Sequence, residues 1–351
     1  MVSPELQYLA SPEGFLFGTT MDFDKTVIIE PGSTAPDYGK CPVCGNRLQP
    51  DWENVESVRC SACRYVKKVS ILIEPGYVVA HKYRILSYLK GGGNGSIFLC
   101  YPLDDPGVRY VLKVLSQPTD TRRKRFRREA DILSTVTGNK RIARIIDYWE
   151  VGEDTYIVME YVDGHNLKEL AVSSIFDEYS VLQIAHEVIR ALQDIWNGYR
   201  IIHRDIKPEN IMLDKNSRLK LLDFGLSKQF DDSMGGSLIT MDSSTLGTPG
   251  YMSPEQFTDF KHVDFRSDIY SLGTTLFFLL TGRESSSGSS MMEFYKSAVA
   301  NSPPAEEYFA GRCSAGCMQM IRKMMQKNPE DRYGSYEELL QDLRILMSNR
   351  G

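Results

Sequence analysis

The sequence lacks a long hydrophobic run and a strong net charge of either sign. Its longest apolar stretch, residues 276–280, is far shorter than the roughly 20 residues of a membrane-spanning helix. The N-terminus shows no pattern that resembles a secretory signal, so we expect a cytoplasmic protein that does not enter a membrane. The formal net charge of −5 argues against a polyanion-binding protein, and nucleic acid is therefore not an expected partner.

Residues 1–40 show little regular hydrophobic periodicity, and four prolines interrupt them. We expect this segment to be an extended, regulatory tail, in which the apolar residues 15–17 and 27–29 are candidates for docking on the folded part of the chain. The whole chain of 351 residues is longer than one typical domain, and its apolar share of 42% suits a packed core.

Four of the seven cysteines form two closely spaced pairs, Cys41 with Cys44 and Cys60 with Cys63. Their spacing is typical of a zinc ribbon, in which four thiolates hold a Zn²⁺ ion. Because so small a segment buries little core, the metal is expected to supply its folding energy in a structural role. Iron, as in rubredoxin-like modules, is the alternative metal, and a reducing cytosol disfavours the other alternative of two disulfides.

Two aspartates carry the clearest chemical signal. Asp205 stands in the motif His-Arg-Asp-Ile-Lys-Pro-Glu-Asn, and Asp223 stands in Leu-Asp-Phe-Gly. In phosphoryl transfer from ATP, a carboxylate orients the attacking hydroxyl while other groups neutralise phosphate charge. We therefore predict that Asp205 accepts the hydroxyl hydrogen bond and that Lys207 neutralises the γ-phosphate. Asn210 and Asp223 would supply oxygen ligands for Mg²⁺.

With the motifs around them, these segments make residues 82–349 resemble the protein kinase family. Val-Leu-Lys-Val resembles the strand that carries the family's phosphate-binding lysine, which would be Lys113. Phe-Arg-Arg-Glu resembles the helix that carries the glutamate paired with this lysine, which would be Glu129. The resemblance implies an enzyme that binds ATP and Mg²⁺. The catalytic residues that it implies are Asp205, Lys207, Lys113 and Glu129.

The resemblance also implies a nucleotide site between a glycine-rich hairpin and a hinge. Residues 89–97 read Leu-Lys-Gly-Gly-Gly-Asn-Gly-Ser-Ile, and such glycines let backbone N–H groups approach phosphate oxygens. Lys90 departs from the family pattern, which has glycine at this position. The expected nucleotide-binding residues are Gly91, Gly92, Gly93, Gly95, Ile97, Lys113, Glu160, Val162, Asn210 and Asp223.

The implied fold is α+β, with an antiparallel sheet lobe, a mainly helical lobe and the small four-cysteine metal-binding module in front. Asp268 and Arg332 resemble the aspartate that braces the catalytic loop and the arginine that pairs with Glu255. The expected divisions are a tail at 1–40, the metal module at 41–70, a linker at 71–81, and a kinase domain at 82–351 with its sheet lobe at 82–159, hinge at 160–163 and helical lobe at 164–351.

Lys207, two positions after the catalytic aspartate, resembles the pattern of serine/threonine-specific kinases. We therefore expect a Ser/Thr protein kinase that phosphorylates proteins and its own chain. One alternative is a pseudokinase adaptor that binds ATP without transferring phosphate, and another is a metal- or redox-responsive regulator. The basic run at 122–128 is expected to be a solvated helix face, with a docking site for an acidic partner or nucleic acid as its alternative.

Overall fold

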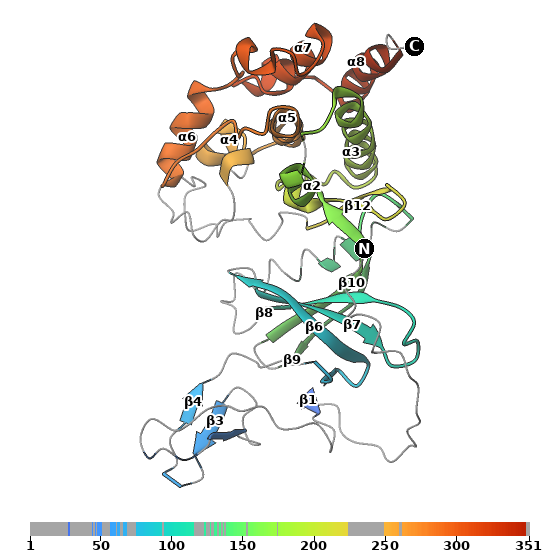
Figure 1. Ribbon diagram of the computed structural model, residues 1–351, viewed down its shortest axis with the longest axis vertical. Coiled ribbons are helices and arrows are strands. Elements are labelled where there is room, and N and C mark those ends of the chain that lie inside the picture. The colour runs from blue at the N-terminus through green and yellow to red at the C-terminus, as the bar shows by residue number, and fades with distance from the viewer. Residues whose placement is uncertain are drawn as a thin grey trace.

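The computed structural model shows a β-sheet lobe and a helical lobe, which occupy the lower and upper halves of Figure 1. It describes residues 27–28, 44, 46, 48–50, 57–60, 62–63, 66–68, 75–92, 95–115, 123, 127, 130–131, 133–134, 136, 138–151, 154–173, 175–223, 249–259 and 262–348. None of the helices within these residues is long and apolar enough to cross a bilayer. The division into two lobes agrees with the predicted fold class.

The sheet lobe is built on one antiparallel sheet of seven strands, in the order β1-β5-β6-β7-β8-β10-β9. β1 belongs to the segment predicted as a tail, and it pairs with β5, which lies in the segment predicted as a linker. The strands are β1 (Val27–Ile28), β5 (Val78–Val79), β6 (Tyr83–Gly92), β7 (Gly95–Pro102), β8 (Tyr110–Leu115), β9 (Ile145–Val151) and β10 (Asp154–Glu160).

One face of this sheet is closed by aromatic and branched side chains. In β7 the buried Phe98 and Cys100 alternate with more exposed residues, as expected of a strand with one covered face. The Trp149 ring stacks on both Tyr83 and Tyr156, with ring centroids 5.9 Å and 5.2 Å apart. Trp149 and Tyr156 stand on the neighbouring strands β9 and β10, whereas Tyr83 stands on β6, so the stacked rings connect β6 with the β9–β10 pair.

The helical lobe packs around α5, which is buried along almost its whole length. A helix that is covered on all sides marks the centre of a lobe. α3 begins at an Asp177 cap that accepts a hydrogen bond from the Ser180 N–H, and it ends at Arg200 in the left-handed region. The helices are α2 (Leu167–Ser173), α3 (Glu178–Tyr199), α4 (Pro254–Thr258), α5 (Arg266–Thr281), α6 (Met291–Ala300), α7 (Ala315–Met324) and α8 (Tyr336–Ser348).

A small antiparallel sheet carries the two aspartate motifs. It consists of β11 (Gly164–Asn166), β12 (Ile211–Asp214) and β13 (Leu219–Leu221), in that order. Asp205 precedes β12, and Asp223 follows β13. Because β12 and β13 are antiparallel neighbours, the start of one lies beside the end of the other, and both aspartates come to the same edge.

Short 3₁₀ turns complete the helical lobe at Pro208–Asn210, Pro249–Tyr251, Glu306–Phe309 and Pro329–Asp331. The first of them closes residues 203–210, the segment that corresponds to the catalytic loop of the predicted family, and leads into β12. Its Pro208 stands at the first helical position, where a missing N–H costs no hydrogen bond.

A third antiparallel sheet lies in the four-cysteine segment and consists of β2 (Leu48–Pro50), β3 (Ser57–Cys60) and β4 (Val66–Lys68). Cys60 closes β3 opposite Leu48, while Cys44 and Cys63 stand in turns and are exposed. Cys41 lies outside the described residues. The boundaries proposed at 41–70 and 71–81 remain predictions.

Candidate active site

Asp205, Lys207 and Asn210 meet in the loop that joins α3 to β12. The Asn210 Nδ2 donates hydrogen bonds of 2.8 Å to the Asp205 Oδ2 and to the Asp205 carbonyl oxygen. The Lys207 Nζ lies 3.1 Å from the same carboxylate, and both side chains are only 13% exposed. Limited solvent access makes the attraction between these charges stronger than at an open surface. The structure thus brings these three predicted residues into one polar cluster.

Asp268, in the first turn of α5, binds the backbone of this loop. Its carboxylate accepts hydrogen bonds from the His203 N–H at 2.7 Å and the Arg204 N–H at 2.8 Å. Burial raises the pKa of Asp268 to about 7, although the two donated bonds oppose this shift. Arg204 itself has a φ of 65°, and such a backbone persists only where the surroundings fix it.

The loop of Asp205 and the segment of Asp223 are connected by two hydrogen bonds. The His203 Nε2 lies 3.0 Å from the Leu222 carbonyl oxygen, and the Leu222 N–H donates to the Asn210 carbonyl oxygen at 2.8 Å. His203 is fully buried. The residue directly before Asp223 is therefore attached to both ends of the catalytic loop, so the two aspartates keep a fixed relative position.

Asp223 and Lys113 form an ion pair that joins the two lobes. The Lys113 Nζ, from β8, lies 2.6 Å from the Asp223 Oδ1, and the Lys113 side chain is 10% exposed. Burial raises the pKa of the Asp223 carboxyl, but the positive charge and hydrogen bond of Lys113 outweigh burial, so the pKa is lowered overall. Asp223 is consequently ionised at neutral pH, as a metal ligand has to be.

The glycine-rich segment forms a tight hairpin between β6 and β7. Gly92, at the end of β6, pairs with Gly95, at the start of β7. Gly95 has a φ of 101°, and a Cβ there would lie 2.2 Å from the Val114 carbonyl oxygen in β8. Only glycine fits such a close approach of two strands. Two residues after Gly95, Ile97 pairs with Lys113, which places the two side chains on one face of the sheet.

The predicted hinge begins at Glu160, the last residue of β10. The Glu160 N–H donates to the Arg144 carbonyl oxygen at 2.8 Å, and its carboxylate lies 2.7 Å from the Lys220 Nζ of β13. Val162 is buried next to it. The Glu160 side chain thus connects the strand end to the small sheet that carries the aspartates, a contact that no motif in the sequence indicated.

Some predicted residues lie outside the described part of the chain, namely Glu129, Gly93 and Cys41. Among the described residues, no group of three or more His, Cys, Asp or Glu side chains is arranged to hold a metal ion. Sequence reasoning also missed Gln256, whose side chain donates to the Arg204 carbonyl oxygen at 3.2 Å. Its position in α4, far along the chain from the catalytic loop, gave no local signal.

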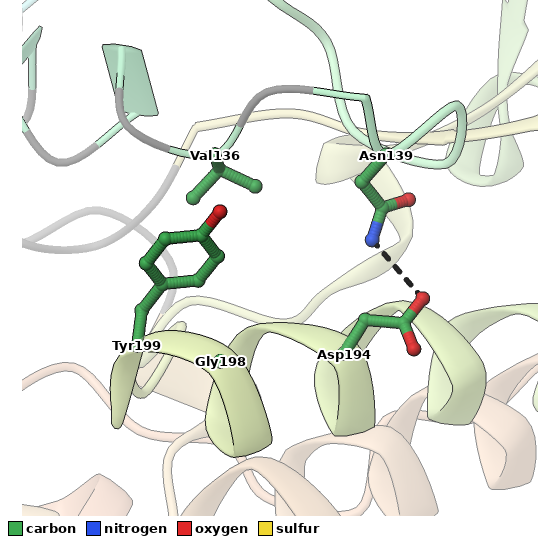
Figure 2. A pocket seen from close by; sticks show the side chains of 5 residues that line it. All are labelled: Val136, Asn139, Asp194, Gly198 and Tyr199. Atoms are coloured by element: carbon green, nitrogen blue, oxygen red, sulfur yellow. Dashed lines mark hydrogen bonds between the residues drawn. The ribbon is translucent and has the colours of Figure 1, made fainter.

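A cavity of about 460 Å³ lies away from these residues, between the segment before β9 and the C-terminal end of α3. Figure 2 shows the Tyr199 ring beside Val136, and Asn139 hydrogen-bonded to Asp194 across the opening. The Asn139 Nδ2 donates to the Asp194 Oδ2 at 3.2 Å. None of the predicted catalytic or nucleotide-binding residues lines this cavity, so it is separate from the candidate active site.

Comparison with known proteins agrees with this geometry. Residues 83–343 match the family model described as protein kinase domain. Serine/threonine-protein kinase pkn3 of Myxococcus xanthus is 34% identical over 286 residues, which cover 78% of this chain and 52% of that protein. Serine/threonine-protein kinase B of Synechocystis is 32% identical over 321 residues, which cover 86% and 51%. The chain thus spans about half the length of these relatives.

A solved structure of Rad53 in complex with AMP-PNP shares the fold. The two structures align with a TM-score of 0.60 at 24% identity, over 74% of this chain and 64% of that one. The family match extends over most of the sheet lobe and the helical lobe, and it contains both aspartate motifs. The chain therefore belongs to the protein kinase family.

Proposed function

We propose that this protein is an ATP-dependent serine/threonine protein kinase, which transfers the γ-phosphoryl group of ATP to hydroxyls of protein substrates. The observation that carries the proposal is the convergence of Asp205 and Asp223, each within 3.1 Å of a lysine ammonium, at one edge of the small sheet. The serine/threonine class is supported by Lys207 and by the names of the relatives, which are serine/threonine-protein kinases.

Each of these residues has a role that its contacts support. Asn210 holds the Asp205 carboxylate in place through a hydrogen bond. In this position the carboxylate would accept a hydrogen bond from a substrate hydroxyl and orient the hydroxyl oxygen toward the γ-phosphorus. Lys207 lies against Asp205 and would neutralise charge that develops on the transferred group. The new oxygen–phosphorus bond forms as the bond to the ADP oxygen breaks.

The donor atoms near Asp223 fit a magnesium ion. Asn210 uses its Nδ2 to bind Asp205, and its amide oxygen lies on the other side of the same group. Together with the ionised Asp223 carboxylate it supplies hard oxygen donors, the kind that Mg²⁺ prefers. A bound Mg²⁺ would neutralise the charge of the nucleotide phosphates. Lys113, from the other lobe, would bind the same phosphates, while Glu160 and Val162 would hold adenine through their backbone.

Transfer of labelled phosphate tests this function. The protein is incubated with γ-labelled ATP, Mg²⁺ and a generic basic protein substrate, and the product is hydrolysed to separate phosphoserine, phosphothreonine and phosphotyrosine. We expect label in phosphoserine and phosphothreonine. The intact mass of the kinase from the same reaction tests self-phosphorylation. Tight ATP binding without any transfer would instead favour a pseudokinase adaptor, and label in phosphotyrosine alone would contradict the acceptor class.

We further propose that the four-cysteine segment holds one structural metal ion through Cys41, Cys44, Cys60 and Cys63. The support is the donor set of four thiolates and the position of Cys60 at the end of β3, close in sequence to the turn that contains Cys63. A three-stranded sheet of so few residues has little core, so a metal would provide its stability. The metal would have no part in phosphoryl transfer.

Metal analysis of the purified chain tests this module. We expect one zinc per chain, lost in a variant that carries Cys44→Ser and Cys63→Ser but kept in Cys100→Ser, which alters a buried cysteine of β7. Iron in place of zinc would appear as a coloured protein with visible absorption. Absence of any bound metal would contradict the proposed module while leaving the kinase proposal intact.

A further inference from the structure

Lys90 lies in the same cross-strand row as the active-site lysine. In the paired strands Lys90 stands opposite Ile97, and Ile97 stands opposite Lys113. Residues directly opposite in antiparallel strands project from the same face of the sheet. Lys90 and Lys113 therefore point to one face, with their strand positions roughly 10 Å apart by the usual strand spacing. That face is the one from which Lys113 reaches Asp223.

An irregularity in β6 gives Lys90 this orientation. The register shifts between Tyr88, which pairs with Phe98, and Lys90, which pairs with Ile97, so Leu89 is an extra residue. Phe98 is buried in the aromatic face of the sheet, and the Tyr88 ring contacts it with centroids 5.6 Å apart. In a regular strand, residues two positions apart such as Tyr88 and Lys90 project from the same face. The bulge turns Lys90 to the opposite face, toward the aspartates.

The charge of Lys90 is available for a ligand. Its side chain is exposed, and no ion pair or hydrogen bond connects it to any residue in the described part of the chain. Lys90 also lies only two residues before Gly92, at the start of the hairpin turn.

We propose that Lys90 is a second nucleotide-binding lysine, which contacts the polyphosphate of ATP from the glycine-rich hairpin while Lys113 contacts it from β8. The inference rests on the proposed function, since it concerns the same nucleotide site. Glycine-rich loops bind phosphate through backbone N–H groups, whose partial charges are weaker than an ammonium. A lysine at this position adds a full charge from the side of the loop, which raises affinity for nucleotides in proportion to their phosphate charge.

Binding of ATP, ADP and adenosine to the full chain, measured by calorimetry with Mg²⁺ present, tests the inference. In Lys90→Met we expect ATP affinity to fall about tenfold, the usual loss for one hydrogen bond to a charged group, with a smaller loss for ADP and none for adenosine. Lys90→Arg should keep most of the affinity. Lys140→Met removes an exposed lysine outside the site and is the matched control for net charge.

Steady-state kinetics give a second readout. If the contact is equally strong in the ground state and the transition state, Lys90→Met raises KM for ATP about tenfold and leaves kcat unchanged. Unchanged ATP affinity in Lys90→Met would overturn the inference, and so would an equal loss for ATP and adenosine, which indicates a distorted hairpin. If the parent chain bound no ATP, the proposed function would fail instead, so the two failures are distinguishable.

Discussion

At the scale of single residues, the ionisation of Asp223 depends on Lys113. Burial favours the neutral carboxyl, and the lysine ammonium at 2.6 Å reverses that preference. The same ammonium belongs to the other lobe of the molecule. The negative charge that would bind a metal ion is thus maintained by a contact between the lobes. If the lobes separated, the ionised form of Asp223 would lose this support.

Replacing Lys113 with methionine is expected to change how stability depends on pH. In the parent chain the pKa of Asp223 is lowered below its ordinary value of 3.8. The contribution of Asp223 to the free energy of unfolding is therefore complete above pH 3.8, and it is lost only as pH falls through the pKa of the folded state. In Lys113→Met burial and the charge of Asp205 raise the pKa of Asp223, and only Lys90 opposes them, so stability declines as pH rises from about 4 to that raised value. The melting temperatures of parent and variant should therefore diverge over this range.

Thermal unfolding followed by circular dichroism between pH 4 and pH 7 measures this divergence. Lys168→Met is a suitable control, because Lys168 pairs with Glu284, which is 40% exposed and well solvated. Its difference from the parent should stay nearly constant with pH. A constant difference for Lys113→Met as well would show that burial of Asp223 is not opposed by Lys113.

The residues of the site that lie in short motifs were predictable from the sequence. Asp205, Lys207 and Asn210 stand within six positions of one another, so their contact follows from the local loop. The contact of Glu160 with Lys220 was not predictable, because the fold alone brings their strands together. Lys90 was visible as a departure from the glycine pattern, but its direction depends on the extra residue in β6, which a single sequence does not reveal.

At the scale of elements, one buried ion pair fixes α4 to the turn before α8. Arg332 donates to both carboxylate oxygens of Glu255, at 2.6 Å and 2.8 Å, and its remaining N–H groups reach the carbonyl oxygens of Gln326, Arg266 and Lys327. The guanidinium is fully enclosed, with a side-chain exposure of 0%. Such a pair is stabilising as long as every donor has an acceptor.

Arg332→Met should therefore strongly destabilise the helical lobe. Removing the guanidinium leaves a poorly solvated Glu255 carboxylate and three carbonyl oxygens without their donor, at a cost of about 3–5 kcal/mol. Lys215→Met is the control, because Lys215 and Asp163 form an exposed pair of the kind worth about 0–1 kcal/mol. Urea unfolding of the parent and both variants gives these free energies. A loss below about 1 kcal/mol for Arg332→Met would contradict the structural role given to this pair.

Long helices are easier to predict from sequence than short strands. Apolar residues between positions 181 and 197 recur with the period of a helix, and the structure has a helix at Glu178–Tyr199, whose start is capped by Asp177. β1 and β5 have only two residues each, too few to show alternation. Their pairing depends on the edge that β6 provides, and that edge exists only in the folded sheet.

At the scale of the whole molecule, the active site depends on how the two lobes are joined. In the segment before β9, the Ala143 N–H donates to the Leu221 carbonyl oxygen at 3.0 Å, and the Arg141 carbonyl oxygen accepts from the Leu221 N–H at 2.7 Å. The Arg141 guanidinium lies 2.7 Å from Glu187 in α3. With the pair of Asn139 and Asp194, these contacts hold the sheet lobe on the helical lobe from the side of the cavity in Figure 2. The ion pair of Lys113 and Asp223 joins the lobes at the site itself.

The central claim is that this joined site transfers phosphate, and the most direct measurement is the rate of γ-phosphoryl transfer for the parent chain, Asp205→Ala and Asp104→Ala. Asp104 is an exposed aspartate in a turn after β7, so its variant controls for the loss of one carboxylate. We predict transfer by the parent and by Asp104→Ala, and a loss of at least about a hundredfold in Asp205→Ala with ATP binding retained. Equal rates in all three proteins would contradict the account.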